Sequence, residues 1–284
     1  MKILVIPPFG HHKNLNGMKA IASYLNFSFN TGTEINIKDN DIIWSPATTL
    51  DSSKYPEKKF IFGPQFGIFA NEKLKGIKNI HGNSVYIQSS EWAAKFWKTG
   101  YVPTKVFPFP VDTNTFRPMY PLTIKKDKVI LYLKHRDPKD VALMKKFLAS
   151  KNVSYEIFKY GSYGEFNYLR TLKMYKYMVV VDAHESQGFA IEEALSCGVP
   201  LLVWNVRTMC QEFKSPPNYK NKPCTNIAYW DERCGEYFYE YSELEDTFSK
   251  FINKLNTYKP REYILENLSV EKSAKRFKEL ISNL

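Results

Sequence analysis

The chain has 284 residues, of which 44% are hydrophobic and 24% charged, and its net charge at pH 7 is +11. This length accommodates two compact domains of about 100 to 150 residues each, and no apolar run approaches the roughly 20 residues that a membrane span requires. The Lys residues are dispersed, without zinc-finger spacing or a basic arm, so an anionic small ligand or a membrane surface explains the charge better than nucleic acid.

The first half of the chain alternates between predicted strands and predicted helices. Residues 1–8 carry a single Lys beside a short apolar core, which is typical of a buried first strand rather than a secretion signal, so we expect a cytoplasmic protein. Short apolar runs predict further strands, and capped periodic segments predict helices. The expected strands are 3–6, 41–46, 59–63 and 85–90, and the expected helices are 16–25 and 91–99.

Four prolines between residues 108 and 121 follow this first half. Pro-rich turns are typical of a linker between domains. We therefore expect an N-terminal domain at residues 1–115 and a second domain at residues 116–265.

The second half repeats the alternation. Apolar runs predict strands at 129–133, 154–158, 178–181 and 201–204, with helices at 140–150 and 166–176 between them. This succession indicates a doubly wound parallel sheet. The last predicted helix, 270–281, places four apolar residues at helical spacing, so one of its faces should pack. These residues are Ala274, Phe277, Leu280 and Ile281.

The sequence implies no metal site. Cys197, Cys210, Cys224 and Cys234 are 13, 14 and 10 positions apart without a Cys-x-x-Cys, so we expect reduced thiols and no zinc. The segment Asp39-Asn40-Asp41 precedes a strand instead of following one, so we interpret it as a turn and not as a metal-binding motif.

Residues 184–200 form the most informative segment of the chain. They lie between the apolar runs 178–181 and 201–204, so a polar loop and a short helix join two buried parallel strands. The loop carries Glu185, and the helix carries Glu193 eight positions later. Gly188 between them allows a close backbone approach to a ligand. The amides at the start of the helix favour an anion at the carboxyl end of the strand.

This pattern resembles the two-glutamate signature of retaining glycosyltransferases with the glycosyltransferase-B fold, in particular glycosyltransferase family 4. In that signature seven residues separate two Glu, with Gly-Phe between them and Gly-x-Pro behind them, as at Glu185, Gly188-Phe189, Glu193 and Gly198-Val199-Pro200. Residues 109–118 also resemble the linker of this family. An ordinary turn with solvated acids is the alternative interpretation.

The resemblance implies a fold and a set of roles. The fold would be α/β, with two Rossmann-like doubly wound domains and a C-terminal helix, at 266–284, that crosses back to the first domain. Glu193 would bind the ribose of a nucleotide, and Glu185 would contact the donor sugar or stabilise the charged transition state. Glu192 would face elsewhere, because neighbouring helix residues point about 100° apart. Backbone amides for sugar or phosphate oxygens would come from Gln187, Gly188, Phe189 and Ala190.

A basic loop follows the strand 129–133 and offers cations for a departing diphosphate. The family usually has an Arg in this loop and a Lys a few positions later, but this chain has His135 and Asp140 at the corresponding positions. Because Arg can bind two phosphate oxygens at once, we expect Arg136 and Lys134 to act in catalysis with Glu185. Lys139 and His135 are further donor-binding candidates, and a solvated basic turn is the alternative.

Two more loops are candidates for binding the donor or the acceptor. In the loop 159–164, Tyr160 could cover the nucleotide base beside Gly161, although this Tyr and Tyr163 could equally well only pack. The loop 8–13 corresponds to a Gly-containing loop that the family uses beside the phosphates and the acceptor. Gly10 suits that donor role, and His11 or His12 could bind donor or acceptor through hydrogen bonds. Weaker candidates are the loop 63–67 and His81.

The resulting prediction is a glycosyltransferase that moves a hexosyl or pentosyl group from a UDP- or GDP-linked sugar to a hydroxyl acceptor. It would retain the anomeric configuration and need neither a metal nor a cofactor. The acceptor would be a glycan, a glycoprotein or a lipid-linked molecule, without a nucleic-acid partner. The aromatic and basic segment 92–98 would permit a weak peripheral membrane contact, or simply pack. The alternatives are a sugar phosphorylase of the same fold and a non-catalytic binder of glycans or nucleotides.

Overall fold

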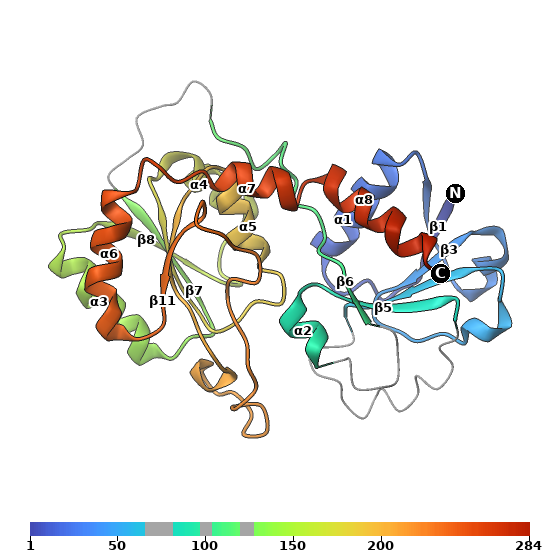
Figure 1. Cartoon of the computed structure of the whole chain (residues 1–284), viewed down its shortest axis with the longest axis horizontal. Coiled ribbons are helices and arrows are strands. Elements are labelled where there is room, and N and C mark those ends of the chain that lie inside the picture. The colour runs from blue at the N-terminus through green and yellow to red at the C-terminus, as the bar shows by residue number, and fades with distance from the viewer. Residues whose placement is uncertain (66–81, 97–103, 120–127) are drawn as a thin grey trace. The chain divides into compact units, whose positions relative to one another are not determined.

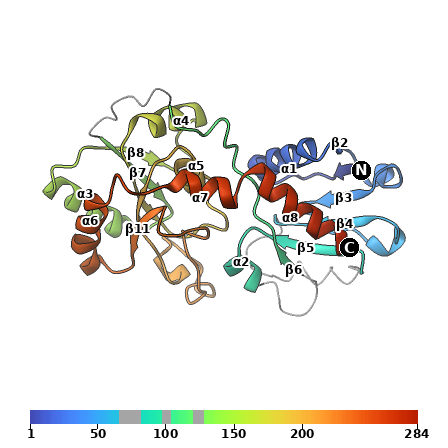
Figure 2. The ribbon, with the colours of Figure 1, turned by 45° about the horizontal axis from the view of Figure 1, so that its top comes forward.

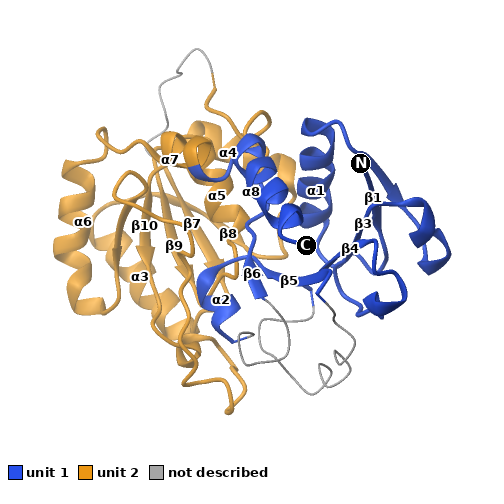
Figure 3. Cartoon of the chain, turned by 45° about the vertical axis from the view of Figure 1, so that its right-hand side comes forward, with its two compact units in different colours: residues 1–110, 267–284 blue, residues 111–266 orange. Residues whose placement is uncertain are grey.

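The computed structural model describes residues 1–65, 82–96, 104–119 and 128–284 (Figure 1). The chain divides into two compact units (Figure 3). Unit 1 consists of residues 1–110 and 267–284, and unit 2 consists of residues 111–266. Each unit is built on one parallel sheet, so the predicted α/β class with two doubly wound domains is confirmed.

The sheet of unit 1 has the strand order β2-β1-β3-β4-β5-β6, and all its neighbouring pairs are parallel. Its central strands are short apolar runs that are buried on both faces, as parallel sheets require. The strands are β1 Lys2–Val5, β2 Ser28–Thr31, β3 Ile42–Ser45, β4 Lys59–Phe62, β5 Ser84–Gln88 and β6 Thr104–Val106. The helices are α1 His12–Tyr24, α2 Glu91–Lys95 and α8 Val270–Ser282.

The C-terminal helix α8 packs beside α1 in unit 1 (Figures 1 and 2). Its apolar stripe buries Ala274, Phe277 and Ile281, and the Phe277 ring lies 6.0 Å from the ring of Phe107. The expectation that the last helix returns to the first domain is therefore confirmed.

The sheet of unit 2 has the order β11-β10-β9-β7-β8, again with parallel neighbours throughout. Its strands are β7 Val129–Lys134, β8 Tyr155–Lys159, β9 Met178–Asp182, β10 Leu201–Trp204 and β11 Gly235–Phe238. Its helices are α3 Pro138–Ser150, α4 Glu165–Met174, α5 Phe189–Ser196, α6 Leu244–Asn253 and α7 Pro260–Asn267, the last of which ends one residue inside unit 1.

Helices cover the sheet of unit 2 from both faces. Alternate strand residues such as Leu131 and Val179 pack with Phe147 of α3 and Phe251 of α6 in one apolar cluster. On the other face the hydroxyl of Tyr168 in α4 donates to the carbonyl of Ala190 in α5 at 2.7 Å. This double cover leaves the carboxyl ends of the strands as the place where polar loops gather.

The Pro-rich connection between the units is held against unit 2 by one arginine. The Arg261 guanidinium donates to the carbonyls of Thr113 at 3.1 Å and Phe116 at 3.1 Å. It also donates to the carbonyl of Ser196, at the end of α5, at 2.7 Å. A cation at a helix C-terminus is electrostatically favourable there.

Most predicted elements exist within about two residues of their expected bounds, but several were not predicted. The elements that were not predicted are β2, β6, β11, α6 and α7, of which α6 is amphipathic and buries Leu244, Phe248 and Phe251. The predicted helix 91–99 corresponds to α2, which ends at Lys95. Residues 97–99 and His81 lie outside the described residues. All four cysteines are free thiols. Among the described residues, no helix has the length and apolarity needed to traverse a bilayer.

Candidate active site

The order in which strands are added to the sheet of unit 2 reverses between β7 and β9, and we call this position the switch point of the sheet. From β7 the chain first adds β8 on one side and then β9 on the other. The register pairs Lys134, the last residue of β7, with Asp182, the last residue of β9. Open α/β sheets bind ligands at such switch points, just beyond the carboxyl ends of the strands.

A buried ion pair occupies this switch point. The ammonium of Lys134 lies 2.7 Å from Oε1 of Glu185, and both side chains are largely buried. The same ammonium sits 4.6 Å from the centroid of the Tyr160 ring. Burial favours a neutral Glu185, but the charge and hydrogen bond of Lys134 outweigh it and hold the pKa of Glu185 below its usual value. Burial likewise opposes the charge on Lys134, whose pKa is nevertheless raised by Glu185 and Asp182.

Two further titratable groups lie against this pair. Burial, reinforced by the charge of Glu185, raises the pKa of Asp182 well above its ordinary value. Burial and the charge of Lys134 lower the pKa of His184 to about 4, so its imidazole is neutral at pH 7. The cluster therefore places the ion pair of Lys134 and Glu185 in a poorly hydrated environment.

The helix α5 begins directly beside this cluster. Its N-cap residue Gly188 has a φ of 95°, in the left-handed region that favours glycine. A Cβ atom at Gly188 would lie 3.3 Å from the Cβ of Glu185, so the small residue also allows the loop to close tightly. Gln187 is buried, and Phe189 and Ala190 open the helix with partly buried side chains.

Both acids on α5 are buried, but they face different neighbours. The carboxylate of Glu192 is fully buried and accepts a hydrogen bond from the Gln187 amide at 3.0 Å. Glu193 is 4% exposed, and its charge acts on the hydroxyls of Tyr163 and Tyr168. These different surroundings agree with the expectation that the two side chains diverge.

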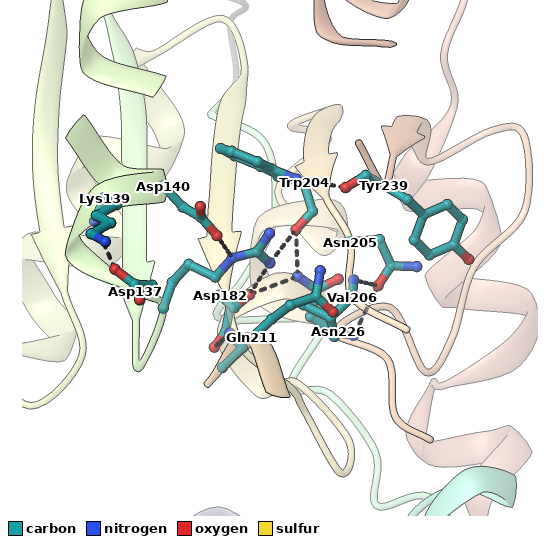
Figure 4. A network of polar contacts seen from close by, with 12 residues as sticks. Asp137, Lys139, Asp140, Asp182, Trp204, Asn205, Val206, Gln211, Asn226 and Tyr239 are labelled. Atoms are coloured by element: carbon teal, nitrogen blue, oxygen red, sulfur yellow. Dashed lines mark hydrogen bonds and ion pairs between the residues drawn. The ribbon is translucent and has the colours of Figure 1, made fainter. Parts of the chain in front are cut away.

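Arg136 lies in a different environment from the one that the sequence led us to expect. Its side chain is only 1% exposed, and Nε lies 2.6 Å from Oδ2 of Asp140. One guanidinium nitrogen donates to the carbonyls of Asp182 at 3.0 Å and Trp204 at 3.3 Å (Figure 4). The guanidinium also lies 4.8 Å from the centroid of the Trp204 ring. Arg136 therefore ties the ends of β9 and β10 together, and Lys134 is the cation that pairs with Glu185.

The other predicted donor-side residues lie around this cluster with more exposure. His135 is exposed, has a φ of 52°, and its ring is 5.8 Å from that of Tyr160. Tyr160 is half-exposed, and Gly161 after it has a φ of 77° with open space around its Cα. Lys139 is exposed in the first turn of α3, where its amide donates to the carboxylate of Asp137 at 2.9 Å. Lys139 is thus turned to solvent.

The predicted first-domain residues lie together in unit 1, at the start of α1. Gly10 has a φ of 66°, and a Cβ there would collide with the Gln65 side chain. His11 caps α1, because its Nδ1 accepts a hydrogen bond from the amide of Lys13 at 3.2 Å. The His12 ring stacks on that of His11 at 4.9 Å.

The segment that connects β10 to β11 also contributes to the switch point, and sequence reasoning missed it. The carbonyl of Thr225 accepts a hydrogen bond from the amide of Glu185 at 3.0 Å. The side-chain amide of Asn226 donates to the carbonyls of Trp204 at 3.0 Å and Asp182 at 3.3 Å, beside Arg136 (Figure 4). Glu212 lies 3.7 Å from Nδ1 of His184. The polar run 205–226 between two strands was the available signal.

Replacing Arg136 with alanine should lower the free energy of unfolding by about 3 kcal/mol or more, because several hydrogen bonds to a charged group are lost. Arg136→Lys should recover only part of this loss, since an ammonium lacks the planar fork. The matched control is the exposed Lys139→Ala, whose effect should stay within about 0.5 kcal/mol. Denaturant unfolding measures all three. Normal stability of Arg136→Ala combined with lost turnover would instead support a direct role at a phosphate.

The chain has the fold of the glycosyltransferase-B enzymes, and the resemblance seen in the sequence is confirmed at the level of the fold. One similar structure is AviGT4, a glycosyltransferase involved in avilamycin A biosynthesis, with a TM-score of 0.64 at 11% identity, covering 99% of this chain and 97% of that chain. Sucrose-phosphate synthase from Thermosynechococcus elongatus gives a TM-score of 0.62 at 10% identity over 99% and 98% of the two chains. The lipopolysaccharide outer core galactosyltransferase WaaB, in its apo form, gives 0.56 at 14% identity over the full length of both chains.

Comparison of the sequence itself finds no matching family model and no matching curated protein. The chain is thus similar in fold to these enzymes at a low level of identity. Within the described ranges, no group of three or more His, Cys, Asp or Glu side chains is arranged to hold a metal ion.

Proposed function

We propose that the chain is a retaining glycosyltransferase that moves a sugar from a UDP- or GDP-linked donor to a hydroxyl acceptor. The observation that supports this most is the buried pair of Lys134 and Glu185 at the switch point of unit 2. Glu185 directly precedes the helix that opens at Gly188 and bears Glu193. A cation for phosphate, an acid for the sugar and an acid for the ribose thus come from the ends of the neighbouring strands β7 and β9 and from the helix after β9.

Each residue has a distinct task in the proposed reaction. Lys134 neutralises the charge that develops on the departing diphosphate. Glu185, which Lys134 keeps ionised, stabilises the positive charge that develops at the anomeric carbon of the donor sugar. Glu193 accepts hydrogen bonds from the ribose hydroxyls, and the amides of Gln187 to Ala190 bind sugar or phosphate oxygens. Tyr160, Gly161 and His135 border the nucleotide side.

Retention follows if the acceptor attacks from the face that the diphosphate leaves. The bond between the anomeric carbon and the phosphate oxygen breaks, and the bond to the acceptor oxygen forms. The acceptor proton passes to the departing phosphate oxygen, so the protein need not supply a general base. Asp182 is poorly suited to that base role, because its side chain is fully buried. Gly10, His11 and His12 of unit 1 are the proposed residues on the acceptor side, and a glycan, glycoprotein or lipid-linked hydroxyl is the proposed acceptor.

A nucleoside diphosphate should stabilise the protein without added metal. At a hundredfold excess over its dissociation constant, UDP or GDP should raise the free energy of unfolding by about 2.7 kcal/mol, in the presence of a chelator. Thermal-shift titration with both nucleotides measures this effect. A strict requirement for a divalent metal, or no shift with either nucleotide, would contradict the proposal.

Hydrolysis of the donor separates the alternatives. A transferase should slowly hydrolyse its own nucleotide sugar when no acceptor is present, whereas a non-catalytic binder should bind the nucleotide and leave the sugar intact. A phosphorylase should instead release sugar phosphate from a glycan when inorganic phosphate is supplied.

A further inference from the structure

A cavity in unit 2 lies at the outer edge of the sheet. It has a volume of about 750 Å³ and is lined by the segment before and within β11 together with α6 and the turn after it. β11 is the last strand of the sheet, and β10 separates it from β9. Gly235 in its lining lies level with Leu201 and Met178, at the amino ends of β10 and β9. Lys134 and Glu185 follow the opposite ends of the strands, so this cavity is separate from the candidate active site.

A row of aromatic rings runs along this edge. Tyr237 lies on β11 and Tyr239 follows the end of this strand, with their ring centroids 5.7 Å apart. The Trp230 ring continues the row at 6.1 Å from Tyr237. Tyr237 is 43% exposed although it is a large aromatic residue on a strand. The exposed ring of Tyr237 is not needed for core packing, and together with the partly exposed Trp230 it offers apolar surface to a ligand.

The lining of the cavity also carries hydrogen-bonding groups that contacts within the protein hold in place. The carboxylate of Glu236 lies 2.7 Å from the ammonium of Lys250 and accepts a hydrogen bond from the Tyr258 hydroxyl at 3.1 Å. Arg233 contacts Asp231 at 2.8 Å and Glu266 at 2.7 Å. These contacts hold donors and acceptors in place before any ligand arrives.

The charges of the lining cancel. Asp231, Glu232 and Glu236 supply three acids, and Arg233, Lys250 and Lys254 supply three bases. The chain as a whole has a net charge of +11, so this cavity is not part of its basic surface. A polyanion such as a nucleotide or nucleic acid would gain little here. A neutral ligand with many hydroxyl groups and flat C–H faces matches the aromatic rings and the hydrogen-bonding groups of this lining.

We propose that this cavity is a second, non-catalytic site that binds a neutral oligosaccharide. The C–H faces of its sugar rings lie on Trp230 and Tyr237, and its hydroxyls bond to Glu236 and the cations around it. The further step, that this oligosaccharide is the non-reacting part of the acceptor, rests on the proposed glycosyl transfer.

The test is binding of the full chain to a glycan array that carries neutral and anionic oligosaccharides. The most strongly bound neutral glycan is then titrated by calorimetry. Tyr237→Ala should weaken this binding by about tenfold, the effect of one well-placed aromatic contact. The matched control is Phe166→Ala, which removes another exposed aromatic ring, 81% exposed, from α4 and should change nothing.

Further variants make the outcome decisive. Trp230→Ala should weaken glycan binding as well. If that variant fails to fold, Glu236→Gln replaces it and should also weaken glycan binding. All of these variants should keep the stabilisation by UDP or GDP, so failure of this site is distinguishable from failure of the proposed function. No binding of neutral glycans, binding of anionic glycans only, or unchanged affinity in Tyr237→Ala would overturn the proposal.

Discussion

Replacing Lys134 with alanine should lower the turnover of a nucleotide sugar by about a hundredfold to a thousandfold. This is the usual cost of losing one preorganised group that stabilises transition-state charge. The ammonium is the cation that the structure pairs with Glu185 at the switch point, and Arg136 is engaged elsewhere. Steady-state turnover of the donor, measured beside Lys139→Ala as the exposed matched control, tests this expectation.

The same substitution should also destabilise the fold, because it leaves the carboxylate of Glu185 buried without its partner. Breaking a buried pair in this way typically costs about 3 to 5 kcal/mol. The double variant Lys134→Met with Glu185→Leu should regain much of that stability and still lack turnover. This separation identifies a catalytic role that a purely structural pair would not have. Near-normal turnover of Lys134→Ala in a folded protein would remove the central element of the proposed mechanism.

Replacing Glu193 with glutamine should weaken the binding of UDP or GDP by about tenfold to a hundredfold. Hydrogen bonds to a charged acceptor contribute about 1.5 to 3 kcal/mol each, and an amide retains only part of that. Calorimetric titration with the nucleotide measures the change. We expect the loss in affinity with little loss in unfolding free energy, because the variant keeps the shape of the side chain.

Glu192→Gln is the matched control on the neighbouring position of α5. Its carboxylate accepts a hydrogen bond from Gln187 within the protein, so this variant should affect stability more than nucleotide affinity. Equal losses of affinity at both positions, or the reverse order, would show that the two acids have been assigned to the wrong faces of the helix.

The local parts of the site could be predicted from the sequence. Glu185, Gly188 and Glu193 belong to one continuous segment, and a strand, a loop and a capped helix fix their spacing whatever surrounds them. The left-handed φ of Gly188 follows from the same reasoning, because only glycine adopts it without strain. The alternation of strands and helices likewise predicted the two parallel sheets, since each short apolar run becomes a strand buried on both faces.

The non-local parts could not be predicted. Both Lys134 and Glu185 were candidates, but their pairing depends on the register between β7 and β9. The backbone of His135 has a left-handed conformation, which turns the chain between Lys134 and Arg136. As a result the Lys134 side chain reaches the switch point, whereas the Arg136 side chain points into the protein. The contributions of Thr225 and Asn226 arise because a long connection folds back over the strand ends. No periodicity in the sequence encodes that return.

The interleaved course of the chain has a consequence for its biosynthesis. Unit 2 is one continuous stretch, whereas unit 1 needs α8, which the ribosome makes after all of unit 2. Until then the ring of Phe107 lacks its contact with Phe277, and the surface of α1 that meets α8 is open to water. Domains generally fold as units during synthesis, in the order in which their parts emerge. Unit 2 can therefore complete its core first, and unit 1, although it begins the chain, is the last to close.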